Sequence, residues 1–174
     1  INPNDKTLQI KNLETDEVFI DTYDKLVIAT GARAAIPPIK GSDANNVFSL
    51  RNIGNMLKIK EFIDNNNPKT AAIVGTGFIG LEMCENLKAL GIEVTLIEKL
   101  PQVTPGLDSD MAVYVKDYIK KNDVEVLTDT LVEEIVDGKV ILSDAREISA
   151  DLVILATGVL PNTELAKNAG IELG

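Results

Sequence analysis

The chain has 174 residues, of which 45% are hydrophobic and 25% charged, and these values are typical of a globular protein with a packed core. Its net charge of −10 argues against nucleic acid or an anionic membrane as a partner. No apolar run approaches the ~18 residues that a membrane span needs, and no signal-peptide pattern is present. The single cysteine, Cys84, cannot form an internal disulfide, and there is no histidine. We therefore expect a reduced, cytoplasmic protein without a metal site.

The first 31 residues are predicted to form β structure. Thr7–Ile10 and Val18–Ile20 are predicted as short strands, and the apolar run Leu26–Ala29 fits a strand buried on both faces. Pro37-Pro38 and Gly41 are typical of a linker, so we expect a domain boundary near them.

The next segment is predicted to be a helix. Asn52 could cap it, and a loop at Asn65–Pro68 ends it. Its predicted apolar face consists of Ile53, Met56, Leu57 and Ile63.

A glycine-rich turn follows between a strand and a helix. The strand is Ala71–Val74, and residues 75–80 (Gly-Thr-Gly-Phe-Ile-Gly) match the pattern G-x-G-x-x-G. The helix after it ends at Gly91 and is predicted to turn one face inward, formed by Ile79, Met83, Leu87 and Leu90. A second buried strand, Val94–Ile97, is followed directly by Glu98.

This order of elements predicts a dinucleotide site. Gly75 allows the tight turn, Gly77 lets a diphosphate approach the main chain, and Gly80 lets the helix pack near the strand. The helix N-terminus offers unpaired N–H groups and a partial positive charge. Glu98 stands where an acid accepts a hydrogen bond from the adenosine ribose. A purely structural glycine turn is the alternative interpretation.

The rest of the chain predicts the same kind of fold. A helix capped by Asp108 or Ser109 has a predicted inward face of Met111, Val115, Tyr118 and Ile119, and a strand at Val124–Leu127 follows it. A hairpin is predicted over residues 131–142, a buried strand over 152–156 and a short helix over 163–169. The predicted fold class is α/β: a Rossmann-like, three-layer domain with a parallel sheet plus a β-meander, of the FAD/NAD(P)-binding type.

Two segments of the chain are similar to each other. Residues 24–31 and residues 151–158 both join an apolar strand to Ala-Thr-Gly, with a proline soon after. A duplicated nucleotide-binding domain would explain this similarity. Chance similarity of two apolar strands is the alternative.

These motifs together resemble the FAD-dependent pyridine nucleotide-disulfide oxidoreductases, in the branch of coenzyme A-disulfide reductases and NADH oxidases. The resemblance is carried by YDKLVIATG (23–31), by VGTGFIGLEMCENL (74–87) joined to VTLIEKLPQVTPGLDSDMA (94–112), and by ADLVILATGVLPNTEL (150–165). It covers nearly the whole chain.

The resemblance implies an organisation and a function. Residues 1–37 would be a trailing β segment of an FAD-binding domain, 38–158 the NAD(P)-binding domain, and 159–174 a return segment toward the FAD domain. The family's first glycine motif, its redox cysteine and its dimerisation domain would lie outside this chain, so it would be an inactive fragment of a homodimeric enzyme. That enzyme would pass hydride from NAD(P)H to FAD and on to a disulfide or oxygen.

The resemblance also implies roles for single residues. Phe78, Ile79 and Glu82 would lie near the nicotinamide, although plain packing or a solvated helix would also explain them. Gly158 would line the nicotinamide side. Thr30, Gly31 and Arg33 would face the FAD, or else form an ordinary turn.

Cofactor choice is expected to depend on Glu98 and Lys99. A carboxylate at Glu98 favours NAD over NADP because it repels a 2′-phosphate, whereas Lys99 could pair with that phosphate. Two other functions stay open: a non-catalytic NAD-binding sensor module, and a site for the adenine half of FAD. Cys84 is predicted to be a small buried hydrophobic residue.

Overall fold

The computed structural model describes residues 1–174, which divide into two compact units. One unit consists of residues 1–33 and 160–174, and the other of residues 34–159. The glycine motif lies in the second unit. None of the helices has the length and apolar character required to cross a membrane.

The second unit is built around a five-stranded sheet in which every neighbouring pair is parallel. The predicted parallel sheet is therefore confirmed. Its order is β4-β11-β5-β6-β7, so the chain adds β6 and β7 on one side of β5 and β11 on the other. The strand bounds are β4 (Val47–Phe48), β5 (Thr70–Val74), β6 (Glu93–Ile97), β7 (Glu125–Leu127) and β11 (Leu152–Leu155).

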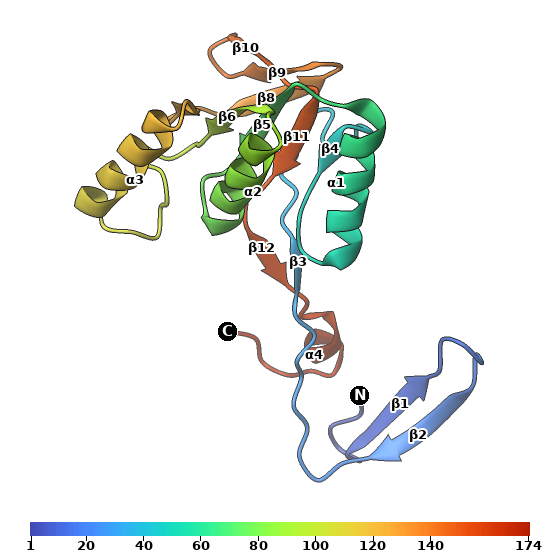
Figure 1. The fold of residues 1–174 in the computed structure, drawn as a ribbon. Helices are drawn as coiled ribbons and strands as arrows, with labels where there is room; N and C mark the ends of the chain where they lie inside the picture. Colours follow the sequence, from blue (N-terminus) through green and yellow to red (C-terminus); the bar gives the residue numbers. More distant parts are fainter. The chain divides into compact units, whose positions relative to one another are not determined.

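Two different layers cover the two faces of this sheet (Figure 1). Alternate residues of β5 separate the faces: Ala71 and Ile73 pack with the helices, whereas Ala72 and Val74 pack with a second sheet. The three-layer prediction is confirmed. The helices are α1 (Ile53–Asn66), α2 (Phe78–Ala89) and α3 (Ser109–Lys121), and the second sheet is the antiparallel meander β8 (Val132–Val136), β9 (Lys139–Leu142) and β10 (Glu147–Ser149).

The helix ends follow from local sequence. Asn52 caps α1 in a reciprocal capping box with Asn55, and Asn67 ends it in the left-handed conformation. Gly91, at φ +79°, follows the last turn of α2, as predicted.

The predicted inward faces of the helices are only partly right. Ile53, Met56 and Leu57 of α1 are exposed, and the helix packs instead through Ile59, Phe62 and Ile63. Because α1 carries two apolar stripes, the sequence pattern does not decide which stripe meets the sheet. Four further predicted core residues, on α2, at its C-cap and on α3, are also exposed: Ile79, Leu90, Met111 and Tyr118.

In the first unit the two predicted short strands are present and pair antiparallel, as β1 (Thr7–Lys11) and β2 (Val18–Thr22). The predicted strand at Leu26–Ala29 is wrong, because the segment has no strand partner and Val27 is 86% exposed. The remaining elements are β3 (Ala32–Ala34) and β12 (Val159–Pro161), which pair with each other, and α4 (Glu164–Asn168).

Candidate dinucleotide-binding site

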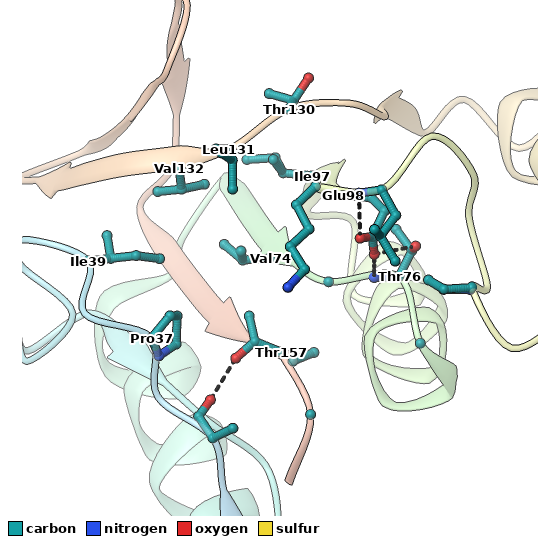
Figure 2. A pocket seen from close by; sticks show the side chains of 18 of the residues that line it. Pro37, Ile39, Val74, Thr76, Ile97, Glu98, Thr130, Leu131, Val132 and Thr157 are labelled. Atoms are coloured by element: carbon teal, nitrogen blue, oxygen red, sulfur yellow. Dashed lines mark hydrogen bonds between the residues drawn. The ribbon is translucent and has the colours of Figure 1, made fainter.

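A cleft of about 460 Å³ opens at the carboxyl ends of β5 and β11 (Figure 2). The sheet changes direction of growth between these two strands, and such a switch point is where open α/β sheets bind ligands. The cleft contains five of the predicted site residues, namely Gly75, Gly77, Glu98, Lys99 and Gly158.

Three glycines form the turn beside the cleft, and two of them, Gly75 and Gly77, line it. Gly75 has φ +101°, and a Cβ there would collide with the carbonyl oxygen of Ala156. A Cβ on Gly80 would collide with the carbonyl oxygen of Gly75, so Gly80 lets α2 pack close to β5. A Cβ on Gly77 would meet no atom within 4 Å. The main chain at Gly77 is therefore open to a ligand.

The N-terminus of α2 begins at this open glycine. Gly77 is the N-cap and provides no side-chain hydrogen bond, and the first turn contains no acidic residue. The first N–H groups of the helix and its partial positive charge are thus available to an anion. A diphosphate fits both the charge and the bare main chain.

Glu98 lies beside the glycine turn and is only 5% exposed. Its Oε2 accepts from both the backbone N–H and the hydroxyl of Thr76, each at 2.9 Å, and these side chains point toward one another in Figure 2. Its Oε1 accepts from Leu100 N–H at 3.0 Å. The Glu98 carboxylate, which is predicted to accept a hydrogen bond from the ribose, is therefore also bonded to the turn that would hold the diphosphate.

Thr76 is a site residue that the sequence did not single out. It is fully buried, and besides the two bonds to Glu98 its carbonyl accepts from Thr104 N–H at 3.1 Å. Thr104 is itself 4% exposed, lies at φ +46°, and has a hydroxyl without a hydrogen-bond partner. The middle position of a G-x-G pattern tolerates many residues, so no sequence signal marked Thr76.

Part of the cleft wall is apolar. Pro37, Ile39, Leu131 and Val132 line it, and their side chains surround its open centre in Figure 2. Gly158 also lines the cleft, at φ +106°, and a Cβ on it would meet no atom within 4 Å. An apolar wall beside open main chain suits a flat aromatic ring.

The structure does not bring every predicted site residue to this cleft. Phe78 is 75% exposed, and with Glu82 it lines a separate groove between α2 and α3. Glu82 also lies beyond the first turn of α2. Ile79 is partly exposed on the same helix. Their roles near a nicotinamide stay predictions.

Thr30, Gly31 and Arg33 lie together in the first unit. They contact Asn162 and Glu164, two residues that the sequence did not single out. Asn162 donates to Thr30 O at 2.9 Å, and its backbone N–H donates to Gly31 O at 2.9 Å. Arg33 donates to Asn162 at 3.2 Å and pairs with Glu164 at 2.9 Å. The final helix, predicted over residues 163–169, has Thr163 as its N-cap.

Cys84 is buried on α2, as predicted. Burial raises the pKa of its thiol from 9.0 to about 11, an effect that Lys88 reduces only in part. The thiol is therefore protonated at neutral pH and a poor nucleophile. No group of three or more Asp, Glu, Cys or His side chains in the structure is placed to hold a metal ion.

The parallel sheet, the glycine turn and the acid after the second strand are the features of a dinucleotide-binding α/β domain. The family model for pyridine nucleotide-disulphide oxidoreductases matches residues 1–174, and the chain belongs to this family.

Curated relatives agree with this assignment. The chain is 42% identical to an NADH oxidase of Methanocaldococcus jannaschii over 100% of this chain and 40% of the relative. It is 31% identical to a coenzyme A disulfide reductase of Staphylococcus haemolyticus over 99% of this chain and 39% of the relative. The predicted branch is thus confirmed, and the chain spans about 40% of the length of these relatives.

Solved structures show the same fold. Reduced CoADR-RHD of Bacillus anthracis superposes with a TM-score of 0.94 at 42% identity, over 100% of this chain and 32% of that one. A water-forming NADH oxidase of Lactobacillus brevis, bound to NADH, gives 0.83 at 28% identity, over 97% and 38%. An NADPH oxidase engineered from that enzyme by five substitutions, bound to NADPH, gives 0.82 at 26%, with the same coverage.

Proposed function

We propose that this chain is the NAD(P)H-binding domain of a flavin-dependent oxidoreductase that passes hydride from NAD(P)H to FAD and on to a disulfide or oxygen. The observation that carries the proposal is the open main chain at Gly77, the middle glycine of the turn, where a Cβ would meet no atom within 4 Å. A glycine turn serving only the fold would give no reason for bare, open backbone at its middle glycine.

The cleft suggests how the dinucleotide lies. Its diphosphate would rest against residues 75–80 at the N-terminus of α2, and its adenosine ribose would meet Glu98. Its nicotinamide would extend toward Gly158. The bound nicotinamide supplies the hydride, while this chain binds the dinucleotide and fixes its orientation.

The engineered oxidase supports the assignment of the ribose end. Its five substituted positions lie at the same intervals along the chain as a set of five residues here, and they change Gly, Asp, Ala, Met and Pro. The corresponding residues of this chain are Gly80, Glu98, Lys99, Leu100 and Pro105. Because these substitutions accompany binding of NADPH in that relative, we infer that the same positions select the cofactor here, and that Glu98 favours NADH.

The rest of the proposal concerns the whole protein. FAD would bind near Thr30, Gly31 and Arg33, and Phe78, Ile79 and Glu82 would lie at the nicotinamide face toward the flavin. The name of the Bacillus anthracis structure gives it in the reduced form, and one relative is named for coenzyme A disulfide, so a disulfide acceptor is the natural first substrate class to test. A cytoplasmic location and a homodimer stay predictions from the sequence.

Calorimetric titration of the chain with NADH, NADPH, ADP and FAD tests the proposal, after circular dichroism has confirmed folding. We expect NADH to bind, and Gly77→Ala to weaken binding by about tenfold or more, because a Cβ would occupy the diphosphate cradle. Gly54→Ala, on exposed α1 surface, is the matched control and should bind as the wild type does. The assignment would be overturned if FAD were the only nucleotide that binds. It would also be overturned if Gly77→Ala bound NADH as tightly as Gly54→Ala does.

A further inference from the structure

The hydrogen bonds around Glu98 leave it little capacity for a ligand. A carboxylate has about four acceptor sites. Three are occupied by Thr76 N–H, the Thr76 hydroxyl and Leu100 N–H. Both bonds from Thr76 fall on Oε2, so the acceptor site that is left belongs to Oε1. Glu98 can therefore accept one ribose hydroxyl, in the orientation that Thr76 and Leu100 set.

Thr76 also fixes the surroundings of this carboxylate. Its carbonyl accepts from Thr104 N–H at 3.1 Å, which anchors the loop that follows Glu98 to the glycine turn. Thr76 lines the cleft, but its side chain is fully buried and its hydroxyl is bonded to Glu98. Thr76 is part of the glycine turn and bonds both Glu98 and the loop after it. It therefore fixes how the turn, the acid and the loop are placed relative to one another.

We propose that Thr76 is a positioning residue that sets how strongly the protein prefers NADH to NADPH, acting through Glu98. The inference rests on the proposed function and adds a residue outside the five positions exchanged in the engineered relative. The hydroxyl of Thr76 holds Oε2 so that Oε1 faces the ribose. Without the hydroxyl, only the N–H groups of Thr76 and Leu100 hold the carboxylate. Its orientation is then less firmly fixed, and both its bond to the 2′-hydroxyl and its repulsion of a 2′-phosphate weaken.

The test is anaerobic stopped-flow reduction of the bound flavin in the full-length, FAD-loaded protein, which does not depend on the terminal acceptor. It gives a Kd and a limiting rate for NADH and for NADPH. We expect Thr76→Val to raise the Kd for NADH by about tenfold, the loss of about one charge-assisted hydrogen bond. The Kd for NADPH should not rise, because the repulsion of its 2′-phosphate weakens. Both limiting rates should change by less than about twofold, because the effect is on the adenosine ribose.

Conservative and control variants separate positioning from packing. Thr76→Ser keeps the hydroxyl and should restore the preference, and Thr76→Ala serves if the valine variant does not fold. Thr95→Val is the matched control, because it removes another Thr–Glu contact, Thr95 Oγ1 to Glu125 Oε2 at 3.4 Å, away from the cleft. It should leave both Kd values unchanged.

The outcomes distinguish this inference from the proposed function. If neither nucleotide reduces the wild-type flavin, the proposed function fails. If Glu98→Gln reduces the preference for NADH while Thr76→Val leaves it unchanged, only the role of Thr76 fails. The role of Thr76 also fails if Thr76→Val weakens the binding of NADH and NADPH equally, or if Thr76→Ser does not restore the preference for NADH.

Discussion

The glycines of the turn show how one residue type meets different demands within six positions. Gly75 is needed by the fold, because it lies at φ +101° and a Cβ there would strike the carbonyl oxygen of Ala156. Gly77 is not needed by the fold: its φ of −69° suits any residue, and the space beside it is open. Stability and binding should therefore respond to different glycines.

We expect Gly75→Ala to lower the free energy of unfolding by about 2 kcal/mol or more, because alanine would be strained at φ +101° and would strike Ala156 O. Gly77→Ala should leave the free energy of unfolding within about 0.5 kcal/mol of the wild-type value. Urea unfolding followed by circular dichroism measures both. Equal loss of stability in the two variants would contradict this division of roles.

Sequence reasoning reached the glycines and Glu98 because their spacing follows from the geometry of a strand, a turn and a helix. It did not reach Thr76, whose importance depends on where its hydroxyl points. It also missed the contacts of Asn162 and Glu164 with Thr30 and Arg33, since these residues lie more than 120 positions apart in the chain.

At the scale of elements, the two central strands are joined at their start as well as along their length. Asp151, just before β11, accepts from the N–H groups of Lys69 at 2.8 Å and Thr70 at 3.0 Å. In return, Thr70 Oγ1 accepts from Asp151 N–H at 3.1 Å. The N–H groups of Lys69 and then Thr70 hold the pKa of the Asp151 carboxyl below its usual 3.8.

This lowered pKa predicts a pH dependence of stability. A group whose pKa is lower in the folded protein stabilises it above the ordinary pKa, and the stabilisation is lost as pH falls through the folded value. Asp151→Asn should therefore cost about 1 kcal/mol at pH 7, a modest amount because the residue is exposed, and much less near pH 3.

Urea unfolding at pH 7 and near pH 3 checks this prediction. Asp43→Asn, at an exposed aspartate with no hydrogen bond or ion pair, is the matched control and should be neutral at both values. A cost for Asp151→Asn that is the same at both pH values would mean that ionisation of Asp151 does not stabilise this strand pair.

The elements themselves were largely predictable, whereas their burial was not. The strands, the hairpin and the helix ends follow from local apolar runs, Asn and Gly. Two predictions failed for this reason: Ile53, Met56 and Leu57 are exposed, and Leu26–Ala29 is not a strand. Both outcomes depend on which surface a segment can pack against. Tertiary contacts decide that, and no local pattern contains them.

At the scale of the whole molecule, the chain carries one complete α/β unit and a second, smaller one. The complete unit has its own core on both faces of the sheet and contains every residue of the cleft. We therefore expect dinucleotide binding to belong to residues 34–159, whereas flavin chemistry requires the remaining length that the relatives have and this chain does not span.

A crystal structure of the protein with NADH tests the central claim most directly. The account predicts the diphosphate against the main chain of Gly75 to Gly80, with a hydroxyl of the adenosine ribose donating to Glu98 Oε1 and the nicotinamide toward Gly158. A dinucleotide bound elsewhere, or one in this cleft with its diphosphate away from Gly77, would contradict it.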